Sequence, residues 1–520
     1  MQLKRLVSIN NLESKDIICC GSNRRYIKQF EEYTNGSCYI KAIASIDTNH
    51  PDKINLGENE VPCVSLPEIK RYKGNCSFVI MDDYYTEYYD ILNEIDSDNT
   101  IDIVWWFADK ETSIEIEYRE KYDSFDLEDI IVFRSGPHAS EYINGMDFSD
   151  NARALFEYLL SVNADKRYMM VWIVKNPDEY ASKFNDRNVK FVSWEWACSE
   201  KPDLREEYYK YLCLAKYIFF TDAYGFTRNA RKDQIRIQLW HGVGFKSRVN
   251  YVRCENRYEY KIDPGPVFAE KSIELYGLRE DQVKILGYPK IDWLFEKDSR
   301  NILSLLGIQK TGKIILWAPT FRKTGGTLKE LDMSDTCFED SLPILDTDLK
   351  IREFNDLLAK KNMTLIIKMH PFQDEASFKD VCYSNIITLS SKKLYSYDIQ
   401  MNQFLKYADA LISDYSSTAT EYMQLDRPIG FIINDQKAYG EERRFAFDPI
   451  EEWLPGEILN TYEDLVHFAD EVYEGKDKSA EKRHGLFSQM HSFSGWGASE
   501  RIAEEFGITK KEDDTNDSAI

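Results

Sequence analysis

The chain has 520 residues, enough for about three domains, and its 43% share of hydrophobic residues is ample for their cores. The net charge of −23, from 66 basic and 89 acidic residues, repels phosphate backbones and argues against nucleic acid as a partner. Ten cysteines without any C-x-x-C spacing fit neither a disulfide framework nor a zinc site. The N-terminus lacks a signal-peptide pattern, and no apolar run reaches the roughly 18 residues of a membrane span, so we expect a cytoplasmic protein.

Residues 1–130 alternate between strand-like and helix-like segments, which predicts a Rossmann-like α/β domain with a parallel sheet. The first turn, GSNRR, departs from the G-x-G-x-x-G pattern of a dinucleotide site and favours a structural or docking module. The charged stretch ETSIEIEYREKYDSFDLED lacks a sustained apolar face and is expected to bridge to the next unit. The expected strands are DIICCGS, YIKAIASID, SFVIMDD and IDIVWWFAD.

Two more α/β blocks follow, over residues 131–285 and 286–508. In the first, SDNARALFEYLLS reads as a helix capped by its serine or aspartate. The strands of the second are buried apolar runs without alternation, as expected of a parallel sheet covered on both faces. Residues 509–520 are polar and are predicted to be disordered. The expected strands are IIVFRSG, RYMMVWIVK, KYLCLAKYIFFTD and QIRIQLWHG, then KIILWAPTFR, MTLIIKMHPF, NIITLS, ALISDYSS and RPIGFIIND.

Chemically versatile side chains gather where these strands end. In parallel α/β sheets, ligands bind at the carboxyl ends of strands, so these residues are the first candidates for a site. Gly242 and Gly244 beside His241 leave room for a substrate to approach the backbone. Each histidine also has a structural interpretation, as a hydrogen-bonded strand end or, for His370 before Pro371, as a turn residue. The strand-end candidates are His241, Thr320, Arg322, Lys368, His370, Asp414, Ser416, Ser417 and Asp435.

The stretch DYSSTATEYMQL predicts a helix start that can bind an anion. Asp414 or Ser416 caps the helix, and the hydroxyl groups of Ser416 and Ser417 add donors beside its unpaired N–H groups. Glu421 would lie a little over one turn into the helix and face the same cleft, where a carboxylate suits ribose hydroxyls. The alternative is that the serines only cap the helix.

A basic stretch surrounds His241 in an otherwise acidic chain. Only Asp233 and Glu255 oppose its cations, so it predicts a local positive field that concentrates an anionic substrate. The alternative is a solvated face whose long aliphatic stems cover apolar surface. The basic residues are Arg228, Arg231, Lys232, Arg236, Lys246, Arg248, Arg253 and Arg257.

Six sequence blocks follow one another along the second and third α/β blocks: IQLWHGVGFK, ILGYPKID, ILWAPTFR, IIKMHP, ISDYSSTATEY and RPIGFII. In this order they resemble the signature blocks of the CDP-glycerol glycerophosphotransferase family, which polymerises teichoic acids and related capsular polymers. The resemblance implies a GT-B architecture, with two Rossmann-like domains facing a cleft, preceded here by the extra N-terminal α/β domain. Residues 131–285 would then form the acceptor-side domain, and residues 286–508 would bind the CDP-linked donor.

The resemblance also implies a reaction, in which an acceptor hydroxyl attacks the β-phosphorus of a CDP-linked alditol and CMP leaves. His241 would be the general base, a role that suits an imidazole near neutral pH. His370, with Lys368 and Arg322, would hold the pyrophosphate and offset charge on the leaving CMP. The remaining donor-side candidates are Thr320, Asp414, Ser416, Ser417 and Glu421, and the substrate-side candidates are Gly242, Lys246 and Asp292.

Two blocks depart from the family pattern. WHGVGFK stands where W-H-G-T-P-L-K is usual, and GYPKID, with Lys290 and Ile291, stands where G-Y-P-R-N-D is usual. These changes leave the transferred alditol open between glycerol, ribitol and another phosphoalditol. Two rival functions are a GT-B sugar-nucleotide glycosyltransferase of surface polysaccharide synthesis and a non-catalytic scaffold in the same pathway.

The expected partners are a CDP-alditol donor and a polymer or lipid-linked acceptor. Such an acceptor would bring the enzyme to the inner face of the cell membrane as a peripheral protein, although no amphipathic basic helix stands out in the sequence. We predict no metal ligands, because no carboxylate cluster is diagnostic. Mg²⁺ stays open as a cofactor, since phosphoryl transfer often uses it.

Overall fold

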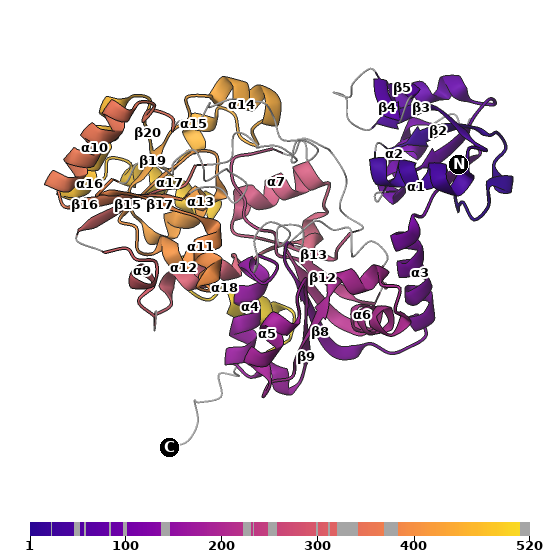
Figure 1. The fold of residues 1–520 in the computed structure, drawn as a ribbon, viewed down its shortest axis with the longest axis horizontal. Helices are drawn as coiled ribbons and strands as arrows, with labels where there is room; N and C mark the ends of the chain where they lie inside the picture. Colours follow the sequence, from indigo (N-terminus) through magenta and orange to yellow (C-terminus); the bar gives the residue numbers. More distant parts are fainter. Residues whose placement is uncertain are drawn as a thin grey trace.

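Three β-sheets follow one another along the chain, with helices packed on their faces, and together they make an elongated molecule (Figure 1). The tail residues 510–520, which the sequence predicts to be disordered, lie outside the described part. The computed structural model describes residues 1–21, 23–45, 53–56, 59–82, 85–96, 101–136, 146–221, 230–231, 233–247, 257–297, 300–309, 312–319, 342–368 and 383–509.

The first sheet has seven strands in the order β1-β7-β6-β2-β3-β5-β4, and every pairing is parallel except the β4–β5 hairpin. Its central strands are buried throughout, which explains why they read as continuous apolar runs. Its strands are β1 (Gln2–Arg5), β2 (Asp16–Cys20), β3 (Tyr39–Ser45), β4 (Lys53–Leu56), β5 (Asn59–Ser65), β6 (Ser77–Ile80) and β7 (Ile103–Trp106), and its helices are α1 (Arg24–Thr34) and α2 (Tyr85–Ile95).

The charged stretch that was expected to bridge is helix α3, Lys110–Tyr122, capped by Asp109. Its buried side chains divide between two cores: Ile116 packs in the core of the first unit, whereas Tyr118 and Tyr122 pack in the core of the next. The Tyr118 ring stacks on Tyr209 with centroids 4.6 Å apart. The bridge is therefore confirmed as a helix shared by two units, and Figure 1 shows it between the first unit and α6.

The second and third sheets share one topology. The orders β10-β9-β8-β11-β12-β13-β14 and β17-β16-β15-β18-β19-β20 both begin with the doubly wound arrangement, in which strand order reverses beside the first strand, and all pairings are parallel. Ligands of such sheets bind at the carboxyl ends of the strands near that reversal. This places the ends of β11, β12 and β18 where a site is expected.

The second sheet contains β8 (Glu128–Arg134), β9 (Met169–Val174), β10 (Val189–Ser193), β11 (Ala215–Phe220), β12 (Ile235–Gln238), β13 (Tyr260–Asp263) and β14 (Val283–Ile285). Its helices are α4 (Asp150–Ser161), α5 (Asp178–Ala181), α6 (Pro202–Leu214) and α7 (Pro266–Tyr276). The helix predicted over SDNARALFEYLLS is thus confirmed as α4, whose inner face is buried.

The third sheet contains β15 (Lys313–Trp317), β16 (Met363–Lys368), β17 (Ile386–Leu389), β18 (Ala410–Ser413), β19 (Ile429–Phe431) and β20 (Glu457–Ile458). Its helices are α8 (Asp292–Phe295), α9 (Ile302–Leu305), α10 (Asp348–Lys360), α11 (Ser391–Ser396), α12 (Met401–Leu405), α13 (Ser417–Tyr422), α14 (Gln436–Arg443), α15 (Ile450–Trp453), α16 (Tyr462–Glu474) and α17 (Ala480–Met490).

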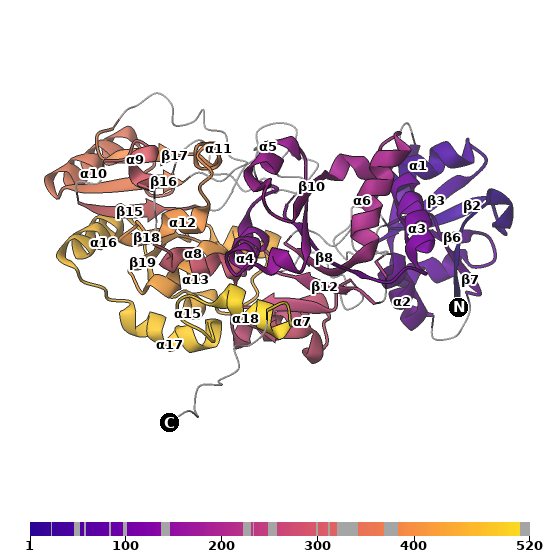
Figure 2. The ribbon, with the colours of Figure 1, turned by 90° about the horizontal axis from the view of Figure 1, so that it is seen from below.

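The last helix, α18 (Ala498–Glu505), returns to the second unit and packs against α4 (Figure 2). Glu505 pairs with Lys284 of β14 at 2.8 Å, and the Tyr217 hydroxyl donates to the carbonyl of Phe506. The sequence assigned residues 286–508 to a single domain, so for α18 this assignment needs correction. The chain crosses between the two units once near residue 290 and again before α18.

Candidate functional site

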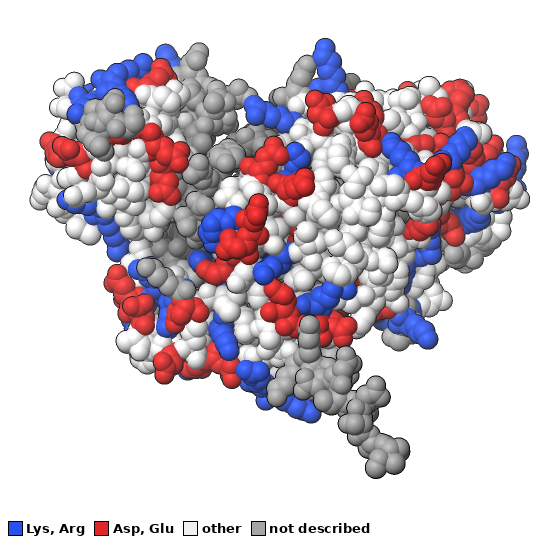
Figure 3. Space-filling view, turned by 180° about the vertical axis from the view of Figure 1, so that it is seen from behind, with Lys and Arg blue, Asp and Glu red and all other residues white. Residues whose placement is uncertain are grey.

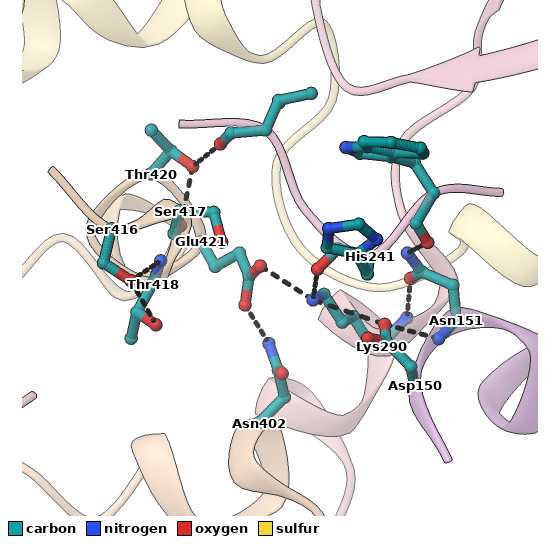
Figure 4. Close-up of polar contacts among 12 residues, drawn as sticks. Asp150, Asn151, His241, Lys290, Asn402, Ser416, Ser417, Thr418, Thr420 and Glu421 are labelled. Carbon is teal, nitrogen blue, oxygen red and sulfur yellow. Dashed lines mark hydrogen bonds and ion pairs between the residues drawn. The ribbon is translucent and has the colours of Figure 1, made fainter. Parts of the chain in front are cut away.

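The loop that follows β12 lies directly against the start of α13 in the third unit (Figure 4). A Cβ atom added at Gly242 would lie 2.6 Å from the Ser417 hydroxyl oxygen, and one at Gly244 would lie 2.9 Å from the Ser417 amide nitrogen. Thr420 Oγ1 also donates to the carbonyl of Val243 across 2.8 Å. The two glycines therefore permit close contact between the two units, where the sequence suggested room for a substrate.

His241, in this loop, is solvent-exposed, and its ring stacks on Trp240 with centroids 4.4 Å apart. Its Nδ1 lies 3.2 Å from the carbonyl oxygen of Thr221. Because a carbonyl only accepts hydrogen bonds, this contact puts the proton of a neutral imidazole on Nδ1 and leaves Nε2 as the basic nitrogen. His241 can therefore accept a proton at Nε2.

The surrounding protein lowers the pKa of His241 from its ordinary 6.5, mainly because burial disfavours the charged ring, while Asp150 opposes this effect. Solvent reaches the His241 side chain, while Trp240 stacks on its ring. The imidazole is accordingly neutral near pH 7, the protonation state that a general base requires.

Lys290 is a buried cation at the boundary between the second and third units. Its Nζ lies 2.8 Å from Glu421 Oε1 and 3.3 Å from Asp150 Oδ1, and it donates to the carbonyl of His241 across 2.7 Å (Figure 4). Burial alone would lower the pKa of Lys290, but the carboxylates of Asp150 and Glu421 outweigh burial and raise it, so the ammonium group stays charged. Since Asp150 begins α4 and Glu421 belongs to α13, one cation joins both units.

Glu421 is buried, whereas the sequence placed it beside a ribose. Its Oε2 accepts from Asn402 Nδ2 across 2.9 Å, and its Oε1 faces Lys290. Burial raises the pKa of the Glu421 carboxyl, and Lys290 opposes that rise. Both oxygens are already engaged by protein groups, so the assignment of Glu421 to ribose hydroxyls is corrected: it is a partner of Lys290.

The start of α13 has the capping geometry that the sequence allowed. Ser416 Oγ accepts from the amide of Thr418 across 3.3 Å and lies 3.2 Å from the Thr418 hydroxyl. Ser417 packs beneath the glycine loop, and Asp414 is buried at the end of β18. The capping role of Ser416 is confirmed, and phosphate binding by the two serines stays a prediction.

The other candidates lie in varied surroundings. Lys368, at the end of β16, is buried and donates to Ser391 Oγ across 2.6 Å. Lys246 is exposed, with Nζ 5.9 Å from the ring centroid of Tyr439. Asp292 is buried and accepts hydrogen bonds from three successive amides at the start of α18, so it has a structural task, and its predicted contact with substrate stays a prediction. Outside the described residues lie Thr320, Arg322 and His370.

The predicted positive field around His241 is corrected for two of its members. Arg231 is buried and paired with Asp233 at 2.7 Å, and Arg236 is paired with Glu259 at 2.6 Å, both near the amino end of β12, opposite to His241. On the face opposite to the view of Figure 1, basic and acidic residues are also interspersed (Figure 3). Of the remaining members, Arg257 is buried, Lys246 is exposed, and Arg228, Lys232, Arg248 and Arg253 lie outside the described part.

A comparison with protein families decides what this arrangement belongs to. The family model described as CDP-glycerol:poly(glycerophosphate) glycerophosphotransferase matches residues 128–506, which include the second and third sheets and α18. The chain belongs to this family. Glycerophosphotransferase signature residues are thus found at the unit boundary, where His241 and α13 meet.

Individual proteins that are similar to this chain agree with its assignment to the glycerophosphotransferase family. The chain is 24% identical over 412 residues to a teichoic acid poly(glycerol phosphate) polymerase of Bacillus spizizenii, covering 73% of this chain and 92% of the relative. It is 28% identical over 297 residues to a teichoic acid ribitol-phosphate primase of the same organism, covering 53% and 69%. A solved structure of the wall teichoic acid polymerase TagF matches with a TM-score of 0.54 at 21% identity, over 76% of this chain and 94% of that chain. This likeness shows that the fold is shared.

The sequence did not reveal the residues that hold the second and third units of this glycerophosphotransferase together. Asp150, Asn151 and Asn402 lie within ordinary helix patterns, and no local signal marks their side chains as interface contacts. One signal was available at Lys290, which replaces the usual arginine of the family block. We attributed that change to the choice of alditol, but Lys290 is buried between carboxylates and Ile291 is buried in the core.

Within the described ranges, no three His, Cys, Asp or Glu side chains gather in a group that could bind a metal ion. Among the helices that the structure describes, none has the length and apolar character needed to cross a bilayer.

Gly244→Ala is expected to destabilise the contact between the second and third units by about 1–3 kcal/mol and to lower the first thermal transition, because the added methyl group would lie 2.9 Å from the Ser417 amide nitrogen and 3.1 Å from the Tyr415 carbonyl oxygen. Both contacts are backbone atoms, so the loop or α13 must move. Thermal unfolding monitored by circular dichroism measures the change. Gly485→Ala is the matched control: it lies in α17 with open space around it, and the better helix former should stabilise the protein slightly. A Gly244→Ala protein as stable as that control would contradict the packing argument.

Proposed function

We propose that the protein transfers a phosphoalditol, either glycerol phosphate or ribitol phosphate, from a CDP-linked donor to a hydroxyl of a growing teichoic-acid-type or capsular polymer and releases CMP. The family match over residues 128–506 supports the reaction class. The observation that carries the mechanism is the exposed His241, whose Nδ1 lies 3.2 Å from the carbonyl oxygen of Thr221 and whose Nε2 is therefore left basic. Relatives named for both glycerol phosphate and ribitol phosphate support the two alditols.

In the proposed step, Nε2 of His241 takes the proton of the acceptor hydroxyl, whose oxygen forms a bond to the β-phosphorus of the donor. The bond between that phosphorus and the bridging oxygen breaks, and the electron pair leaves with CMP. Lys368 and the serines at the start of α13 lie on the donor side in this proposal, together with Thr320, Arg322 and His370. Their cations and hydroxyl groups offset the charge that develops on the leaving phosphate.

The proposed architecture is GT-B, in which the second unit receives the acceptor and the third unit binds CDP. The sheet before them is an accessory Rossmann-like domain, joined through α3. The acceptor is the hydroxyl end of a polymer or of a lipid-linked primer, so the enzyme works as a peripheral protein at the inner membrane face. The primase and polymerase names of the relatives support these two kinds of acceptor.

CMP release tests this function. We expect the purified protein to release CMP from CDP-glycerol or CDP-ribitol in the presence of a lipid-linked or oligomeric primer, measured by chromatography of the nucleotides. UDP-linked and GDP-linked sugars, at the same concentration, are the matched donors for the rival glycosyltransferase and should release no nucleotide. Release of UDP or GDP would overturn the phosphoalditol assignment, and thermal protection by neither CDP-alditol would overturn the proposed donor.

A further inference from the structure

The backbone carbonyls of His241, the predicted base, and of the two residues before it each accept a hydrogen bond from a side chain. Asn151 Nδ2 donates to the carbonyl of Leu239 across 3.2 Å and to that of Trp240 across 2.9 Å. Lys290 Nζ donates to the carbonyl of His241 across 2.7 Å. The three residues that follow Gln238, the last residue of β12, are therefore held by side chains from outside their loop.

The loop needs such restraint because its backbone is unusual. Trp240 has φ of 54° and Gly242 has φ of 126°, both in the left-handed region that L side chains rarely adopt. A non-glycine residue in that region costs about 1–3 kcal/mol and persists only where its surroundings fix it. The strained Trp240 directly precedes His241 and the positive-φ Gly242 directly follows it, so the direction of the imidazole depends on contacts that fix this backbone.

The two side chains that supply these contacts are themselves joined. The backbone N–H of Lys290 donates to Asn151 Oδ1 across 3.0 Å, so the amide of Asn151 bridges the loop and residue 290. Nζ of Lys290 also lies 2.8 Å from Glu421 Oε1 on α13 and 3.3 Å from Asp150 Oδ1 on α4 (Figure 4). Asn151 and Lys290 are thus joined to each other, and of the two it is Lys290 that contacts α13 of the third unit.

We infer that Lys290 and Asn151 form a clamp that positions His241, and that the pairing of Lys290 with Glu421 ties this position to the contact between the second and third units. The catalytic consequence rests on the proposed function, whereas the positioning itself does not. Lys290 is a positioning residue, since it touches the carbonyl of His241 and no reacting atom. When α13 and the loop are in contact, the carbonyl of His241 is held; when they separate, one of the attractions that hold Lys290 in place is lost.

A simpler role for Lys290 is charge compensation, because its buried cation also prevents the buried carboxylate of Glu421 and the partly buried one of Asp150 from remaining unpaired. The two roles separate in a pair of variants. Lys290→Met removes both the hydrogen bond to the loop and the charge. Lys290→Met combined with Glu421→Gln removes the same hydrogen bond and also the carboxylate charge that Lys290→Met leaves unpaired at residue 421. The double variant should therefore be more stable than Lys290→Met but still lack the clamp.

The clamp predicts that both variants lower kcat for CMP release by about 10²-fold, the typical cost of a displacement near 1 Å at a reacting group, with little change in the donor KM. Backbone amides of the loop after β12 should exchange hydrogen faster in both variants, as measured by mass spectrometry. Lys290→Arg, which keeps the charge and a donor, should recover most of the activity. Lys284→Met is the matched control, because Lys284 of β14 makes a partly exposed 2.8 Å ion pair with Glu505, away from the loop, and its loss should leave kcat unchanged.

Recovery of both kcat and slow loop exchange in the double variant would overturn the clamp and leave charge compensation as the role of Lys290. The exchange measurement needs no substrate, so it tests the clamp even if the wild-type protein releases no CMP. In that event fast exchange in both variants would support the positioning and the proposed function alone would fail. Unchanged exchange in both variants would overturn the clamp whatever the protein catalyses.

Discussion

Replacing His241 by alanine should lower the rate of CMP release by about 10²-fold or more, because general-base catalysis typically contributes that much. The imidazole is the group whose Nε2 is left basic by the contact between Nδ1 and the Thr221 carbonyl. Since burial lowers its pKa from 6.5, the acid limb of the wild-type profile of kcat/KM should lie below pH 6.5: the neutral base is present above that pKa and is protonated, and inactive, below it. Initial rates from pH 5 to 9 measure both effects.

The matched control is His467→Ala, which removes an imidazole that is 60% exposed on α16 and should leave the rate unchanged. Donor affinity is measured separately by calorimetry, so that loss of binding is not mistaken for loss of the base. A His241→Ala enzyme that binds the donor normally and is only a few-fold slower would rule out the assignment. An acid limb above pH 6.5 would mean that a different group titrates.

Most of the strand pattern could be predicted from the sequence, because buried parallel strands read as apolar runs. The expected strands of the third block, such as KIILW and MTLIIK, lie in β15 and β16 with nearly every residue buried. Strand ends could be predicted for the same reason, since each polar residue that follows an apolar run lies at an edge of the sheet. The position of His241 was predictable in this way.

The partners of the site residues could not be predicted, because they come from distant parts of the chain. Glu421 has helix spacing that allows it to face a ligand, and only the folded chain shows that Lys290 and Asn402 occupy its oxygens. Gly242 and Gly244 suggest access for a substrate, yet the neighbour that requires their small size is Ser417. The local sequence shows which positions carry unusual residues, but the reason for those residues is the contact between two units that the folded chain makes.

The return of α18 was missed for a related reason. A helix after a doubly wound unit has an apolar face whichever sheet it covers, so its own pattern does not identify the unit on which it packs. The deciding feature is Asp292, whose carboxylate receives the amides of Gly497, Ala498 and Ser499 at 2.8–2.9 Å. The sequence could not reveal this structural task of Asp292, because the amides that its carboxylate accepts from lie about two hundred residues later in the chain.

Asp292→Ala should destabilise the protein by about 3 kcal/mol, because it leaves three buried amides at the start of α18 without an acceptor and removes a carboxylate from a helix N-terminus. The chain has several units, so unfolding is not a single transition. Hydrogen exchange of α18, followed together with the first thermal transition, therefore measures the effect. Asp292→Asn keeps one carbonyl acceptor and should fall between the wild type and Asp292→Ala.

Asp281→Ala provides the comparison, since its carboxylate is 74% exposed in a surface pair with Arg279 and its loss should change neither exchange nor unfolding. The two interpretations of Asp292 predict opposite outcomes. If the residue anchors α18, the variant loses stability, and its donor KM below the unfolding temperature stays near that of the wild type. If α18 instead exchanges as slowly as in the wild type while the donor KM rises, Asp292 contacts substrate and the anchoring role is wrong.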